Sequence, residues 1–221
     1  MKKTLLLFLL AAFSLSAQQV EKRPLGTFTK LEVTGHFDVQ LVKTGDAIIV
    51  SAAVPASLPR IKTVITNGTL RIYADGTVKG DVDITVPYTT LNEIVLNGSG
   101  DISADSEVQT KNLKVVLTGS GDIKLKVAAA DADVTLIGSG DLILSGTADA
   151  VSASVNGSGD LDAGSLRAKT VRVTVTGSGD ATVYASGSIK ADVEGSGDIR
   201  YKGNPEQEDT SVHGSGSITK V

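Results

Sequence analysis

The sequence predicts an all-β protein, a parallel β-helix of about seven short rungs preceded by an N-terminal β-rich cap. Two observations carry this prediction. The tetrad Gly-Ser-Gly-Asp occurs six times and once more as Gly-Ser-Gly-Ser, with successive first glycines 21, 19, 19, 20, 18 and 19 residues apart. A nearly fixed period of this size is typical of stacked repeats. After residue 17, apolar side chains alternate with polar ones, which indicates strands rather than helices.

Residues 1–17 have the pattern of a signal peptide. Lys2 and Lys3 precede an apolar run from Leu5 to Leu15, and small residues follow. The apolar run is too short to span a membrane. We therefore expect an exported protein in the periplasm, on the outer-membrane surface or outside the cell, with no transmembrane span once the signal peptide is removed.

Residues 18–87 are predicted to form the β-rich cap. Asn67-Gly68 predicts a two-residue hairpin, and Pro55 and Pro59 are expected to bracket a loop. Val33–Val39 resembles a degenerate repeat, and we expect the cap to cover the open end of the stack, whose unpaired backbone groups would otherwise promote aggregation. The expected strands are 31–34, 37–42, 48–53, 61–66, 69–73 and 82–86.

Residues 88–221 are predicted to form the repeat region, continuous with the cap. When the seven units are aligned on their first glycine, the positions two and four residues before it and just after the tetrad are mostly apolar. Each unit thus reads as strand, tight turn and strand with one apolar face. One unit cannot bury that face alone, whereas units stacked about 4.8 Å apart can. The crossover rule favours a right-handed coil.

The tetrad glycines are predicted to be structural turn residues, because glycine permits positive φ and close backbone approach. The aspartate of each tetrad can accept a hydrogen bond from a turn N–H group. The predicted turn residues are Gly98, Gly100, Gly119, Gly121, Gly138, Gly140, Gly157, Gly159, Gly177, Gly179, Gly195, Gly197, Gly214 and Gly216.

The stacked aspartates also admit a second interpretation. Carboxylates at rung spacing repel one another, and a bound cation would relieve that repulsion. Calcium prefers several carboxylate and carbonyl oxygens, so a calcium ladder stays open as the alternative to turn capping. The candidate ligands are Asp101, Asp122, Asp141, Asp160, Asp180 and Asp198.

Composition and motifs argue against several classes of function. The 21 basic and 25 acidic residues become 19 and 25 without Lys2 and Lys3, a net charge of −6, which disfavours nucleic acid as a partner. Because the chain has no cysteine, disulfides and thiolate metal sites are excluded. The repeated aspartates have nearly identical surroundings, whereas acid–base catalysis needs two groups in different environments. We expect no enzyme, no catalytic residues and no cofactor.

The tandem tetrads, the Val33–Val39 element and the signal peptide together resemble the secreted Bacteroidetes proteins described as "putative auto-transporter adhesin, head GIN domain". The resemblance covers roughly Phe28 to Val221. It implies a right-handed β-helix-like fold and a cell-surface or periplasmic setting, and it brings no catalytic residues.

The resulting hypothesis is an adhesin-like or cell-envelope interaction module that binds an unidentified surface protein or glycan, with homo-oligomerisation left open. Two alternatives remain. One is a carbohydrate-active or glycan-binding protein that uses the aspartate ladder, and the other is a purely structural envelope protein.

Overall fold

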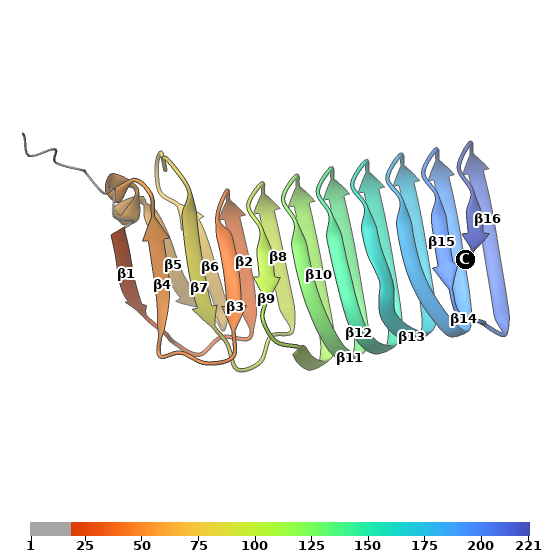
Figure 1. Ribbon diagram of the computed structural model, residues 1–221, viewed down its shortest axis with the longest axis horizontal. Coiled ribbons are helices and arrows are strands. Elements are labelled where there is room, and N and C mark those ends of the chain that lie inside the picture. Colours follow the sequence, from red (N-terminus) through yellow and green to blue (C-terminus); the bar gives the residue numbers. More distant parts are fainter. Residues whose placement is uncertain (1–18) are drawn as a thin grey trace, which may run out of the picture.

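The computed structural model describes residues 19–221, so the predicted signal peptide lies outside the described residues. Within these residues, 17 strands form one continuous sheet that coils into an elongated solenoid, with the strands running across the long axis (Figure 1). About seven turns are stacked. The prediction of an all-β stack of parallel rungs is confirmed. No helix among residues 19–221 is long and apolar enough to cross a membrane.

The first part of the chain contains seven strands and one short 3-10 helix. These are β1 (Gln19–Pro24), β2 (Lys30–Gly35), β3 (Asp38–Val42), β4 (Ala47–Ala52), η1 (Pro55–Arg60), β5 (Ile61–Thr66), β6 (Thr69–Ala74) and β7 (Val82–Pro87). The stack that follows consists of β8 (Glu93–Gly98), β9 (Ile102–Ala104), β10 (Val108–Gly119), β11 (Ile123–Gly138), β12 (Leu142–Gly157), β13 (Leu161–Gly177), β14 (Ala181–Gly195), β15 (Ile199–Lys202), β16 (Gln207–Gly214) and β17 (Ile218–Lys220).

The stack is parallel and in register. The first glycines of neighbouring tetrads pair with one another, as in Gly119↔Gly138 and Gly138↔Gly157. Register places like positions above one another, so the apolar columns become continuous ladders in the interior. The column two residues before the first glycine is at most 1% exposed from the first tetrad to the sixth: Leu96, Leu117, Leu136, Val155, Val175 and Val193. Burying such a side chain contributes about 1.5–3 kcal/mol, which explains why the stack needs the repeated pattern.

The connections between repeat units differ from the expectation. The sequence predicted strands only beside each tetrad, whereas β11 to β14 are each one strand of 15 to 17 residues. Each of these strands bends at the end of the rung opposite the tetrads (Figure 1). Pairing continues through the bend, as in Ala129↔Ala148 and Asp131↔Ala150. Because the neighbouring rungs pair with most of the backbone through the bend, the chain needs no separate loop there.

The cap does not follow chain order. β2 lies between β6 and β8, and β3 lies between β7 and β9, all as parallel pairs. The strands β2 and β3 therefore form the turn next to the repeats. Gly35 pairs with Gly98, and the Asp101 N–H donates to Asp38 Oδ1 at 3.2 Å, as between two tetrads of the stack.

The outermost part of the cap is antiparallel, with β1 paired to β4 and β5 paired to β6. The predicted hairpin at Asn67-Gly68 is confirmed, with φ of 51° and 73° at the two residues. The prediction of a loop between Pro55 and Pro59 was wrong, because this segment forms the 3-10 helix η1. Strand β1 was not predicted, since its side chains are mostly exposed and lack apolar alternation.

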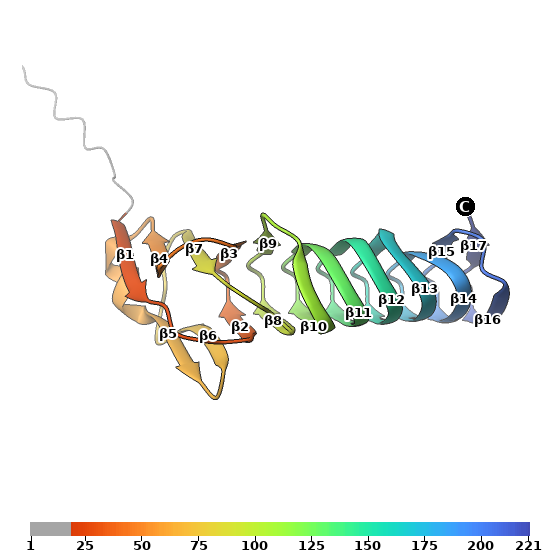
Figure 2. The same ribbon diagram turned by 90° about the horizontal axis from the view of Figure 1, so that it is seen from below.

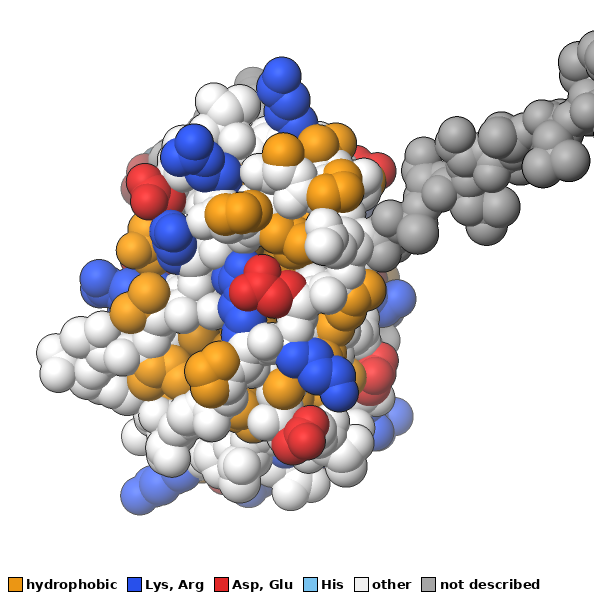
Figure 3. Space-filling view, turned by 90° about the vertical axis from the view of Figure 1, so that its left-hand side faces the viewer, with side chains coloured by type: hydrophobic (Ala, Val, Ile, Leu, Met, Phe, Trp, Pro, Cys, Tyr) orange, Lys and Arg blue, Asp and Glu red, His pale blue; other side chains and the backbone are white. Residues whose placement is uncertain are grey.

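The two ends of the solenoid are finished differently. The N-terminal end carries β1, η1 and the projecting β5–β6 hairpin (Figure 2), and its surface mixes hydrophobic and charged side chains (Figure 3). At the C-terminal end, β16 pairs only with β14 and β17 only with β15. Val212 is accordingly 41% exposed, whereas Val193 in the preceding rung is fully buried. Charged and polar side chains on β16 limit edge-to-edge association of this end.

Candidate binding surfaces

The tetrads stack at one corner of the solenoid, where neighbouring backbones approach closely. At Gly157, φ is 128°, and a Cβ atom would lie 2.3 Å from the carbonyl oxygen of Gly138. At Gly159, a Cβ atom would lie 2.1 Å from the carbonyl oxygen of Gly140. The first glycine is therefore required both for its positive φ and for the close approach of the neighbouring backbone. The second glycine is required for the close approach alone.

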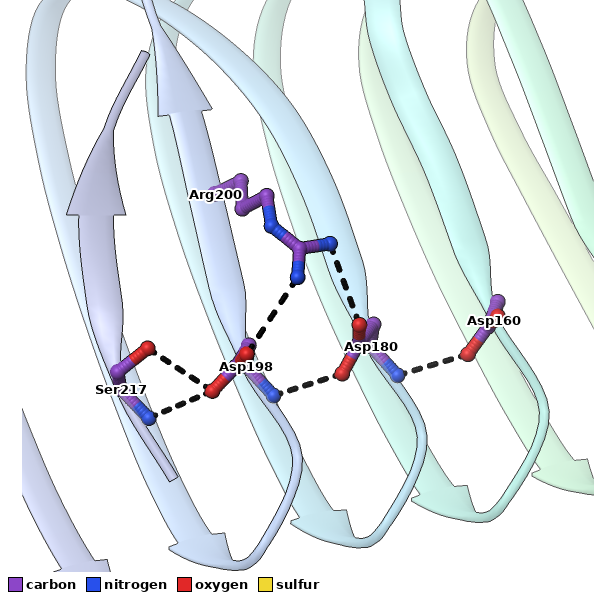
Figure 4. A network of polar contacts seen from close by, with 5 residues as sticks. All are labelled: Asp160, Asp180, Asp198, Arg200 and Ser217. Carbon is purple, nitrogen blue, oxygen red and sulfur yellow. Dashed lines mark hydrogen bonds and ion pairs between the residues drawn. The ribbon is translucent and has the colours of Figure 1, made fainter.

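The aspartates of the tetrads form a ladder along this corner. The Oδ1 atom of Asp160 accepts the Asp180 N–H at 2.8 Å, and that of Asp180 accepts the Asp198 N–H at 2.9 Å (Figure 4). The same contact links the other members of the ladder, Asp101, Asp122 and Asp141, at 3.0–3.3 Å. The donor is therefore the backbone of the next rung, so the carboxylates join neighbouring rungs. Ser217 ends the ladder by donating its N–H and its hydroxyl to Asp198.

Arg200 offsets negative charge near the C-terminal end of the ladder. Its guanidinium lies 3.2 Å from Asp180 Oδ2 and 3.4 Å from Asp198 Oδ2 (Figure 4). At the other end, loss of surrounding water raises the pKa of Asp38, and the charges of Asp101, Asp83 and Asp81 raise it further. The ionised form of the Asp38 carboxyl is thus disfavoured where the ladder meets the cap.

We expect Asp38→Asn to raise the melting temperature slightly at neutral pH, because asparagine keeps an oxygen acceptor without the charge. A raised pKa means that the ionised carboxylate disfavours the folded state above the folded-state pKa, and that this penalty vanishes below the ordinary value of 3.8. The difference in melting temperature should therefore disappear as the pH falls. Thermal unfolding between pH 3 and 7 checks this. The exposed turn variant Asp46→Asn serves as the control, and an equal shift in both variants would contradict the assignment.

The carboxylates of the ladder have partners in the backbone of the next rung. Among residues 19–221, no group of three or more histidine, aspartate or glutamate side chains is arranged to hold a metal ion. One oxygen of each ladder carboxylate already accepts a backbone N–H, as at Asp141, which receives the Asp160 N–H. We expect calcium titration to give neither heat nor a change in melting temperature, and a saturable calorimetric signal would restore the calcium hypothesis.

The candidate catalytic residue types are scattered. His36 lies in the cap, and His213 lies on the exposed terminal rung, where its Nε2 atom is 3.2 Å from Ser211 Oγ. In the described chain, no carboxylate is hydrogen-bonded to this imidazole, and none of the cavities described below includes the pair. Tyr88 and Tyr201 are buried, so their rings pack in the interior.

A groove runs across the rungs on the face formed by β2, β8 and β10 to β13. It has a volume of about 550 Å³ and follows the outer surface where these strands begin to bend. Its floor is formed at Leu113, Ala132 and Val151, and one wall is a registered outward-facing column. This column consists of Lys30, Glu93, Lys114, Asp133, Ser152 and Arg172. Small residues keep the groove open over several rungs.

Within residues 19–221, the charged side chains of the groove wall are ion-paired near the cap and not ion-paired farther along the stack. Near the cap, Glu93 lies 2.8 Å from Lys30 Nζ and 3.4 Å from Lys114 Nζ. The hydrogen bond from Lys30 is the main cause that lowers the pKa of Glu93, and Lys114 adds to it. Farther along, Asp133 and Arg172 form no ion pair with any residue in the described range. These two side chains line the groove, with Ser152 between them in the register.

Sequence reasoning missed this groove. The residues of its charged wall each lie five positions before the first glycine of a unit. The alternating signs of charge in this column were the one sequence signal that could have indicated an outward-facing surface. The concavity itself depends on where the long strands bend, which the repeat pattern does not reveal.

The sequence was compared with known protein families and with proteins of known structure. The model of the family described as "Putative auto-transporter adhesin, head GIN domain" matches residues 27–205. Among proteins with curated descriptions, none matches the sequence.

Several crystal structures are similar. A "putative adhesin" from Bacteroides fragilis NCTC 9343 is 27% identical with a TM-score of 0.87, and the match covers 92% of this chain and 97% of that one. A "putative lipid binding protein" from Parabacteroides distasonis ATCC 8503 is 24% identical with a TM-score of 0.76, over 92% and 96% of the two chains. A "putative adhesin" from Parabacteroides merdae ATCC 43184 is 20% identical with a TM-score of 0.72, over 92% and 96%. The last two likenesses concern the fold alone.

The family match spans most of the chain and includes the cap turn at Gly35 as well as the tetrad corners up to Gly197. The chain therefore belongs to the family described as "Putative auto-transporter adhesin, head GIN domain".

Proposed function

We propose that this protein is an exported, non-enzymatic adhesin-like module that binds an elongated surface partner, a protein or a glycan, along the groove. The observation that carries the proposal is the groove itself, which crosses successive rungs and presents polar groups at the rung spacing. A partner with its own linear repeat can contact equivalent positions one after another. Family membership and the likeness to the Bacteroides adhesin support a binding role.

Export rests on the signal-peptide pattern at residues 1–17, and the cell surface is the setting that the family description suggests. A non-enzymatic role is supported by the aspartate ladder, whose carboxylates accept the same backbone contact rung after rung. Glycoside cleavage would instead require one pair of carboxyl groups with distinct environments.

The groove can be tested by filling it. We expect Ser152→Trp to weaken retention on the bound surface about tenfold or more, a loss of about 1.4 kcal/mol, because the indole would occupy the groove between its walls. Ile143→Trp is the matched control, since Ile143 lies on the same strand β12, is 40% exposed and lines no part of the groove.

The measurement is a binding screen of the purified protein against intact bacterial and host cell surfaces and against immobilised polysaccharides. Release of cleaved saccharide would contradict the non-enzymatic proposal. Retention that Ser152→Trp leaves unchanged would remove the groove as the site. Failure to bind any surface would favour the purely structural alternative.

A further inference from the structure

One rung departs from the regular stack about midway between two tetrads, outside the groove lining. The tetrads at Gly157 and Gly177 are 20 residues apart, and the next step to Gly195 is 18. The register between β13 and β14 accordingly shifts between Ala163 and Arg167. Such bulges turn side chains in new directions and occur often beside functional sites.

The shift pairs Arg167 with Tyr184. The two residues are register partners, and the guanidinium carbon of Arg167 lies 5.7 Å from the centre of the Tyr184 ring. Gly203 borders this ring from the next rung, where a Cβ atom would lie 3.4 Å from Tyr184 Cζ. The ring thus packs against bare backbone on that side. A guanidinium stacked on such a ring keeps its N–H edge available for a planar anion.

A pocket of about 460 Å³ lies beside this pair. It is lined by Arg167, Tyr184, Thr147, Asp149 and, among others, Lys169, whose ammonium lies 2.7 Å from Asp149 Oδ1. The lining therefore combines a guanidinium edge, a hydroxyl and a carboxylate that is already partly neutralised. These groups lie on three neighbouring strands, β12, β13 and β14.

The charges around the pocket are unbalanced. Arg167 forms no ion pair with an acidic side chain within residues 19–221, and neither does Lys202, the register partner of Tyr184 on β15. Of these two cations, Arg167 lines the pocket and Lys202 lies two rungs away in the register, beyond Tyr184. Arg167 favours an anionic ligand group, whereas the Asp149 carboxylate disfavours a densely anionic one and favours hydroxyl groups that can donate to it.

We infer that this pocket binds a carboxylate-bearing saccharide, such as a uronic acid unit of an acidic glycan. The saccharide carboxylate lies against the guanidinium edge of Arg167, which offers two parallel N–H donors. The hydroxyl groups of the sugar ring bond to Thr147 and Asp149. Tyr184 is a positioning residue that holds the guanidinium in orientation. This site is separate from the groove and does not depend on the proposed role of the groove.

The test is calorimetric titration of the purified protein with oligogalacturonate, and with the same oligosaccharide after its carboxyl groups have been reduced to alcohols. We expect saturable binding of the acidic form and at least tenfold weaker binding of the reduced form. Arg167→Gln should weaken binding at least tenfold, and Arg167→Lys should restore part of it. The control Lys124→Gln removes an exposed cation that lies on the same face outside the pocket and should leave binding unchanged.

Tyr184→Leu separates positioning from charge. It should weaken binding of oligogalacturonate several-fold while circular dichroism shows a folded protein, and higher salt should weaken this variant more than the parent protein, because its guanidinium is no longer oriented.

Four results would overturn the assignment. Equal binding of the acidic and reduced oligosaccharides would show that the pocket does not recognise the saccharide carboxylate. Equal losses of binding in Arg167→Gln and Lys124→Gln would indicate unspecific charge attraction. Tighter binding of oligoglutamate than of oligogalacturonate would point to an acidic protein partner instead. Loss of oligogalacturonate binding in Ser152→Trp, with Arg167→Gln unaffected, would place the saccharide in the groove.

Discussion

Gly159→Val is expected to lower the free energy of unfolding by about 3 kcal/mol, through overpacking of a backbone contact that cannot relax. The first added carbon would already lie 2.1 Å from the carbonyl oxygen of Gly140, well inside contact distance. The obstructing atom belongs to the backbone of a rung held by neighbours on both sides. The corner must therefore separate, and the ladder bonds beside it lengthen or break.

Ser158→Ala is the matched control for this prediction. Ser158 lies between the two glycines of the same tetrad, its side chain is exposed, and its backbone N–H donates to the Gly138 carbonyl oxygen at 2.9 Å whatever the side chain is. Removing the hydroxyl should change stability by no more than about 0.5 kcal/mol. Urea unfolding of both variants measures the difference, and equal midpoints would show that the corner does not require glycine.

Phe37→Ala is expected to destabilise the protein by about 3–5 kcal/mol, the usual cost of emptying a fully buried aromatic site. Phe37 is completely buried and lies where the cap joins the stack. It occupies the position of the second tetrad glycine, and its backbone faces Gly100, where a Cβ atom would lie 2.1 Å from the Phe37 carbonyl oxygen. Its loss would leave a cavity between the cap and the first regular rung.

His36→Ala provides the comparison for that variant. His36 is exposed, precedes Phe37 and stacks on it with ring centres 5.6 Å apart. We expect a change within about 0.5 kcal/mol. Urea unfolding followed by two probes adds a further expectation, since a cap that detaches first would make the Phe37→Ala transition lose its two-state character. Similar stabilities of the two variants would show that Phe37 does not join cap and stack.

The regular part of the fold was largely predictable from local pattern. Alternation along one strand determines which side chains face inward, and the recurrence of the tetrad determines that successive turns align. Val155 and Val175 each lie two residues before the first glycine of a tetrad, so the sequence alone assigns them to one buried column. The structure pairs them in register and buries both.

The cap was predicted strand by strand but not in its arrangement. The hairpin at Asn67-Gly68 is a local feature and was correct. The insertion of β2 between β6 and β8 joins segments far apart in the chain, and β1 forms only because β4 offers it an edge. Pairings of this kind depend on long-range contacts that alternation within one segment does not encode.

The sequence by itself determined the solenoid, its period, its glycine corner and its apolar interior, because each depends on a pattern repeated within about 20 residues. Only the tertiary structure decided where the candidate binding surfaces lie. The groove depends on where the long strands bend, and the Arg167–Tyr184 pair depends on a register shift between adjacent rungs. Outward-facing side chains have no common partner in the core, so their neighbours are determined by register and bending alone. For this reason the repeat predicts the fold but not the groove or the Arg167–Tyr184 pocket.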